Sequence, residues 1–82
     1  MEWDLIDTIT TIIEKFAGKS PTADAHLFDE GYLDSLSFLG LVEELESHFN
    51  VRMTAEFMNE ENFSTLEKIE KTIAQIIKSQ HA

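Results

Sequence analysis

The chain has 82 residues, 43% of them hydrophobic, and no cysteine, which excludes disulfides and thiolate metal sites and leaves helix packing to hold one small core. Sixteen acidic against six basic residues give a formal net charge of −10, which disfavours nucleic acid and anionic lipids and favours proteins with basic surfaces. No apolar run is long enough to cross a bilayer and no secretion signal is evident, so we expect a cytoplasmic monomer that does not insert into membranes.

The first predicted helix covers about residues 4–17. Its apolar side chains recur every three or four residues and share one face: Leu5, Ile6, Ile9, Ile12, Ile13 and Phe16. Gly18 ends this helix. The loop over residues 18–34 is long for so small a domain, so we expect it to be packed on the core or to carry function.

The second predicted helix covers about residues 35–49 and has the same periodicity. A short third helix is expected over about 54–61, where a few apolar residues lie among polar ones. The fourth, over about 64–79, opens on the capping pattern Ser64-Thr65-Leu66-Glu67. The sequence therefore predicts one all-α domain over residues 1–82, a small bundle of three longer helices and one short helix.

A serine in the first turn of the second helix is the main candidate for chemistry. It lies in Asp34-Ser35-Leu36, at a helix N-terminus whose dipole favours an anion such as a phosphodiester. An isolated serine or aspartate at a helix start is more often only a cap, and for Asp34 capping and a functional role are compatible.

This motif resembles the attachment site of the acyl and peptidyl carrier proteins, which bear 4'-phosphopantetheine on the serine of an Asp-Ser-Leu motif at the start of their second helix. The resemblance runs from about Leu5 to Ile77 and includes Asn62-Phe63-Ser64-Thr65-Leu66. It implies a carrier bundle, a covalent arm on Ser35, a thioester-bound acyl or aminoacyl cargo, and no catalysis by the chain itself.

The resemblance also implies the partners of the protein. These are a phosphopantetheinyl transferase, a loading enzyme that is either an adenylating enzyme or an acyltransferase, and downstream transfer or condensing enzymes. In the complex with the transferase, Asp34 is expected to help hold the metal ion. Gly31 precedes Asp34 by three residues, a spacing similar to D-alanyl carrier proteins and to discrete carriers of polyketide or nonribosomal peptide biosynthesis.

The outer face of the second helix is a candidate docking surface. Leu36 and Glu43 lie opposite its buried face, and Gly40 either admits a partner, admits a neighbouring helix or is simply tolerated. The candidate partner-binding residues are Asp34, Leu36, Leu39, Gly40, Glu43, Glu46 and Met53. For Met53, a place in the core is the stronger interpretation. Apolar cargo is hypothesised to shelter between the second and third helices, near Leu39, Val42, Met53 and Phe57.

Other functional classes fit less well. The main alternative is a small acidic interaction module in which Ser35 stays unmodified. The segment Asp29-Glu30-Gly31 lacks the alternating oxygen ligands of a calcium loop. His26, His48 and His81 share no metal-ligand spacing and are assigned no role.

Overall fold

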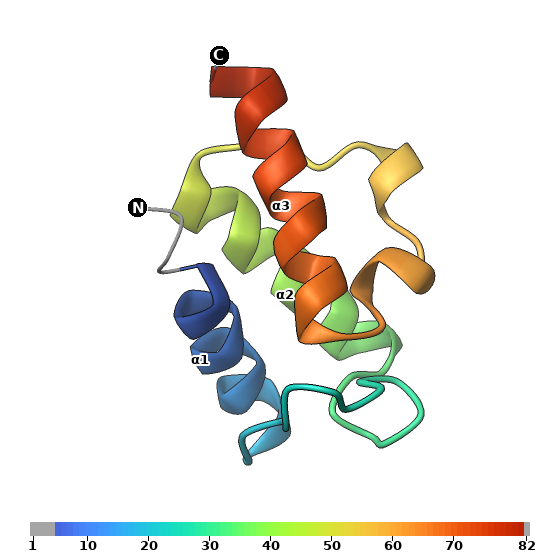
Figure 1. Ribbon diagram of the computed structural model, residues 1–82. Coiled ribbons are helices and arrows are strands. Elements are labelled where there is room, and N and C mark those ends of the chain that lie inside the picture. Colours follow the sequence, from blue (N-terminus) through green and yellow to red (C-terminus); the bar gives the residue numbers. More distant parts are fainter. Residues whose placement is uncertain (1–4, 82) are drawn as a thin grey trace.

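The computed structural model describes residues 5–81, which contain helices and no strand. The α-helices are α1 (Leu5–Ala17), α2 (Ser35–Phe49) and α3 (Leu66–His81), and two single 3-10 turns, η2 (Ala55–Phe57) and η3 (Glu61–Phe63), connect α2 to α3 (Figure 1). The predicted all-α bundle of the carrier type is confirmed. The expected start of the first helix at residue 4 lies outside the described residues.

The core lies where the three helices meet. Its fully buried side chains come from every α-helix, from the loop before α2 and from η3: Ile9, Ile13, Leu27, Leu41, Leu45, Phe63, Ile69, Ile73 and Ile76. Helix α1 packs against both α2 and α3. Within residues 5–81, none of the helices combines the length and the apolar character that crossing a membrane requires.

The segment expected to form one short helix over about 54–61 instead forms η2 and η3. Asparagine side chains explain the interruption, because they bond the backbone in place of helical partners. The amide of Asn62 donates from N to Asn59 Oδ1 at 2.9 Å, and its side chain donates from Nδ2 to Phe57 O at 3.1 Å. The last helix also starts later than expected, at Leu66, where Thr65 Oγ1 accepts from Lys68 N at 3.2 Å as an N-cap does.

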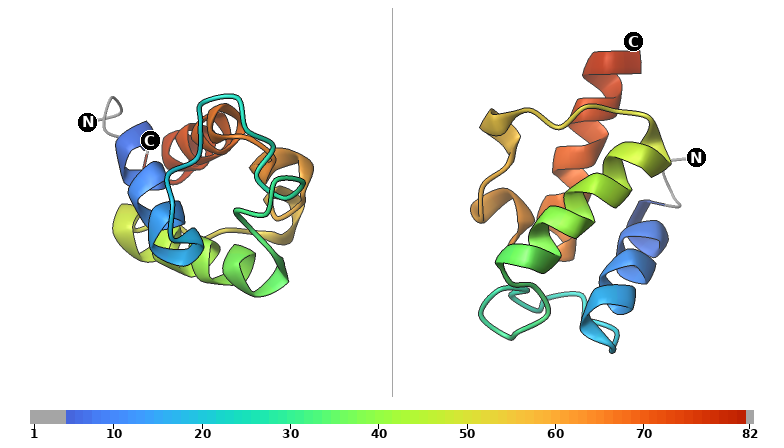
Figure 2. Two further views of the ribbon diagram at one scale, coloured as in Figure 1. Left: turned by 90° about the horizontal axis from the view of Figure 1, so that it is seen from below. Right: turned by 180° about the vertical axis from the view of Figure 1, so that it is seen from behind.

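The loop over residues 18–34 is packed on the core and places the start of α2. It crosses one end of the bundle between α1 and α2 (Figure 2, left). Leu27 is fully buried, and its amide donates to Ser64 O at 2.7 Å, at the approach to α3. Its carbonyl accepts from Tyr32 N and Leu33 N, at 2.9 and 3.0 Å. Gly31 has a φ of 85°, a conformation that favours glycine, and it turns the chain back toward Ser35.

Candidate functional site

Ser35 is the first residue of α2, and its side chain is exposed. Asp34 before it has extended backbone angles, and its Oδ1 accepts from Ser37 N at 2.8 Å. Asp34 therefore is the N-cap, as the capping interpretation predicts. Hydrogen bonds to the carboxylate, the Ser37 amide first among them, lower the pKa of Asp34 below its ordinary value. An exposed hydroxyl thus stands beside a carboxylate that is ionised at neutral pH.

A groove of 710 Å³ runs beside Ser35. It lies between the first turns of α2, the preceding loop and the segment after η2, and it is lined by Phe28, Asp29, Leu33, Asp34, Ser35, Phe38, Leu39, Met58, Asn59 and Glu60. Phe38 anchors this region to the core, since its ring lies 5.8 Å from that of Phe28 and 5.0 Å, edge to face, from that of Phe63. A group attached to Ser35 can therefore lie along a partly apolar surface.

The cargo shelter expected from the sequence needs correction. Leu39 does line the groove beside Ser35, but Val42 and Met53 are only 4% and 6% exposed and belong to the core. Phe57 packs against that core and does not line the groove. The helical period placed Val42 on the buried face, but it could not distinguish a packed core from a cavity.

The candidate docking surface on α2 is exposed at its centre. The side chains of Leu36 and Leu39 are 81% and 51% exposed, and Glu43 is also exposed. Gly40 is half-buried because α1 approaches it: a Cβ atom there would lie 2.7 Å from both Cε1 and Cζ of Phe16. Of the alternatives open for Gly40, the structure therefore supports close approach of a neighbouring helix.

Two further candidates, Glu46 and Met53, have structural roles in the fold. Glu46 is half-buried, and its Oε2 accepts from Met53 N at 2.7 Å. Its carbonyl accepts from the amides of Asn50, the left-handed residue that ends α2, and of Val51. Glu46 thus clamps the chain where it turns back after α2, and Met53 is buried by that turn.

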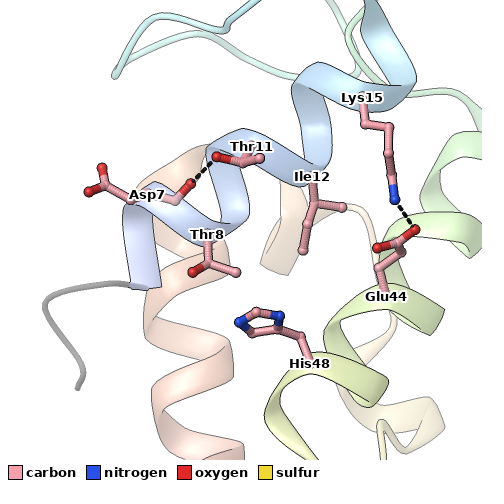
Figure 3. Close-up of a pocket in the computed structure, with 7 residues that line it drawn as sticks. All are labelled: Asp7, Thr8, Thr11, Ile12, Lys15, Glu44 and His48. Carbon is pink, nitrogen blue, oxygen red and sulfur yellow. Dashed lines mark hydrogen bonds and ion pairs between the residues drawn. The ribbon is translucent and has the colours of Figure 1, made fainter.

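A second groove, of 410 Å³, separates α1 from α2 (Figure 3). Lys15 from α1 points to Glu44 of α2 and forms an ion pair with it, and His48 of α2 projects toward Thr8 and Ile12 (Figure 3). Ser35 does not line this groove. The ion pair neutralises the basic residue in the last turn of α1.

The fold brings together three potential metal ligands that the sequence did not connect. Ligand atoms of His26, Asp29 and Glu60 lie within 4.8 Å of one another. However, His26 Nδ1 is also 3.2 Å from Asp29 N, which donates a hydrogen bond to it, and 3.6 Å from Asp29 Oδ2. His26 Nδ1 therefore takes part in a hydrogen bond within the loop that leads to Ser35.

Comparison with known proteins extends over nearly the whole chain. Residues 7–73 match the family described as "Phosphopantetheine attachment site". The D-alanyl carrier protein of Streptococcus suis (strain 05ZYH33) is 36% identical over 81 residues, which cover 96% of this chain and 99% of that protein. Those of Streptococcus pyogenes serotypes M5 (strain Manfredo) and M1 are 35% identical over 77 residues, which cover 88% of this chain and 94% of each. The matched range contains Asp34, Ser35 and the groove beside them.

Proposed function

Because this chain belongs to the phosphopantetheine-binding carrier protein family, we propose that Ser35 bears the arm and that D-alanyl is the cargo. Members of this family carry a covalent 4'-phosphopantetheine, are not themselves enzymes, and interact with a phosphopantetheinyl transferase and with loading and transfer enzymes. When bound, the arm supplies a thiol, which this cysteine-free chain lacks, and holds the cargo as a thioester.

The observation that carries the proposal is the exposed Ser35 in the first turn of α2, next to its groove. In the modification, Ser35 Oγ bonds to the phosphorus of the pantetheine phosphate of coenzyme A. The bond from that phosphorus to 3',5'-ADP breaks, and the Oγ proton passes to a base of the transferase. The positive end of the α2 dipole favours the phosphodiester that forms.

Asp34 has two opposing effects on this chemistry. Its carboxylate holds the first turn of α2 through Ser37 N, which positions Ser35. Its negative charge, however, repels a phosphate group at the neighbouring residue. A divalent cation held by the Asp34 carboxylate in the transferase complex would offset this repulsion by supplying positive charge. This supports a metal-holding role for Asp34 in that complex.

Two observations favour D-alanyl over a larger acyl cargo. The first is the similarity to D-alanyl carrier proteins along their length, which agrees with the resemblance of the Gly31-to-Asp34 spacing to that of such carriers. The second is the packing of Val42 and Met53, which are core residues. A long acyl chain must displace such side chains to reach the interior, whereas a small aminoacyl group needs no such change.

The second candidate is a discrete carrier of polyketide or nonribosomal peptide biosynthesis, which the Gly31 spacing also allows. Either carrier role places the protein in the cytoplasm, where coenzyme A and ATP are available. The partners differ: a D-alanine-adenylating enzyme loads the first kind of carrier, and an acyltransferase or another adenylating enzyme loads the second. Cargo selection in vitro therefore separates the two candidates.

The test has two stages. The intact mass is measured after incubation with coenzyme A, Mg²⁺ and a broad-specificity phosphopantetheinyl transferase, and wild type should gain one phosphopantetheinyl group while Ser35→Ala gains none. The modified protein then receives ATP, a D-alanine-adenylating enzyme and either D-alanine or L-alanine. Thioester formation with D-alanine alone supports the proposed cargo. Failure of the first stage with a folded protein leaves an interaction module with unmodified Ser35, and failure of the second alone rejects D-alanyl.

A further inference from the structure

Among residues 5–81, the large apolar side chains that remain exposed gather around the first turns of α2. They are Phe16, Leu36 and Leu39, which are 38%, 81% and 51% exposed. Leu36 and Leu39 are neighbours because they stand three residues apart on one helix, and Leu36 and Gly40 are neighbours because they stand four apart. The Phe16 ring lies over Gly40, which is one helical turn from Leu36. We call these three side chains, Phe16, Leu36 and Leu39, the apolar strip.

Gly40 lets Phe16 of α1 approach the outer side of α2. Glycine is unfavourable inside a helix, but any larger residue here would meet Cε1 and Cζ of Phe16. The helices lie next to each other, and both are in view in the right-hand panel of Figure 2. Because position 40 has no side chain, the aromatic ring lies close to α2 there, and Phe16 stays 38% exposed.

The charges around the strip favour a basic partner. Glu43 is exposed one turn after Leu39, and the whole chain carries a formal net charge of −10. Lys15 is the basic residue next to Phe16, with its Nζ 5.8 Å from the ring centroid, and it is paired with Glu44 (Figure 3). The positive charge of Lys15 is thus compensated by Glu44. An enzyme with basic residues around an apolar pocket therefore meets no net repulsion from Lys15 beside Phe16.

We propose that Phe16, seated on Gly40, completes with Leu36 and Leu39 the surface that docks the phosphopantetheinyl transferase. This rests on the proposed modification of Ser35. The transferase acts on Ser35 Oγ itself, so its surface must cover the first two turns of α2, where Leu36 and Leu39 lie. A loading enzyme acts at the far end of a flexible arm, so its surface does not have to cover these turns of α2. The partner surface is an apolar pocket edged by lysine or arginine side chains.

The test compares rates of modification by the broad-specificity transferase with coenzyme A and Mg²⁺. Phe16→Ala should lower kcat/KM about fivefold to twentyfold, mainly through KM, because it removes the exposed part of an aromatic ring from the contact. Phe16→Leu should recover most of the rate. Phe49→Ala is the control for loss of a phenylalanine ring: Phe49 is half-buried and lies at the other end of α2, and kcat/KM should stay within about twofold of wild type.

Circular dichroism shows whether each variant folds, and Gly40→Ala provides a second probe that keeps Phe16 but displaces its ring. An unchanged kcat/KM in folded Phe16→Ala, or an equal loss in Phe49→Ala, would overturn the proposal. So would a loss confined to loading of the modified protein. Absence of modification in wild type would refute both this proposal and the proposed function, whereas normal modification of all variants would refute only the docking role.

Discussion

Gly40→Ala tests how tightly Phe16 of α1 packs against α2 at position 40. Alanine is favoured over glycine in a helix by about 1 kcal/mol. The new methyl group, however, would lie 2.7 Å from two ring carbons of Phe16, whose side chain is already 38% exposed and can swing outward. A phenylalanine buries about 200 Å², so exposing a further ~60 Å² costs about 1.5 kcal/mol. The net change in wild type is therefore a loss of about 0.5 kcal/mol.

The same substitution should have the opposite sign once the ring is removed. In a Phe16→Ala background the methyl group meets no ring, so Gly40→Ala should stabilise the protein by about 1 kcal/mol. Urea unfolding of wild type, the two single variants and the double variant gives this coupling, expected near 1.5 kcal/mol. In a domain of this size, 1 kcal/mol shifts the melting temperature by about 4–8 °C. Equal stabilisation in both backgrounds would refute the inference that Phe16 is seated on Gly40.

Substitutions at three other positions test the site and the fold. Asp34→Asn should keep the N-cap and lower the melting temperature only slightly at neutral pH, whereas Asp34→Ala should lower it further, and both should slow modification of Ser35 if the carboxylate holds the metal ion. Folding lowers the pKa of Asp34, so the stabilising effect of its carboxylate is complete above the ordinary pKa of 3.8 and is lost as pH falls through the lower native pKa. The melting temperatures of wild type and Asp34→Asn should therefore converge at acid pH. A difference that stays constant with pH would contradict this linkage. Glu46→Ala should lower the free energy of unfolding in urea by about 1 kcal/mol, since it removes the acceptor for Met53 N. It should leave kcat/KM of Ser35 modification unchanged, and a lowered kcat/KM would indicate that Glu46 belongs to the docking surface. Phe63→Ala should cost about 3–5 kcal/mol, a large part of the total stability, and loss of less than ~1 kcal/mol in the same assay would show that this buried ring is not central to the core.

The sequence alone was sufficient for the features that depend on neighbours along the chain. Apolar residues at helical spacing predicted the three long helices and the all-α bundle, because an amphipathic helix must bury one face wherever it packs. The same spacing placed Leu36 outside and Leu41 inside, as the structure does. Asp34 was identified as a cap candidate because its hydrogen bond reaches only as far as Ser37.

Only the tertiary structure decided the features that join distant segments. The absence of a side chain at Gly40 is explained by Phe16 on another helix, and the structural role of Glu46 depends on the chain that turns back to place Met53 beside it. A helical wheel of α2 shows on which side of the helix Gly40 and Glu46 lie, but it does not include Phe16 or Met53. The periodicity of α2 therefore determined which residues face outward, whereas packing against α1 and the segment after α2 decided which of them remain free to meet a partner.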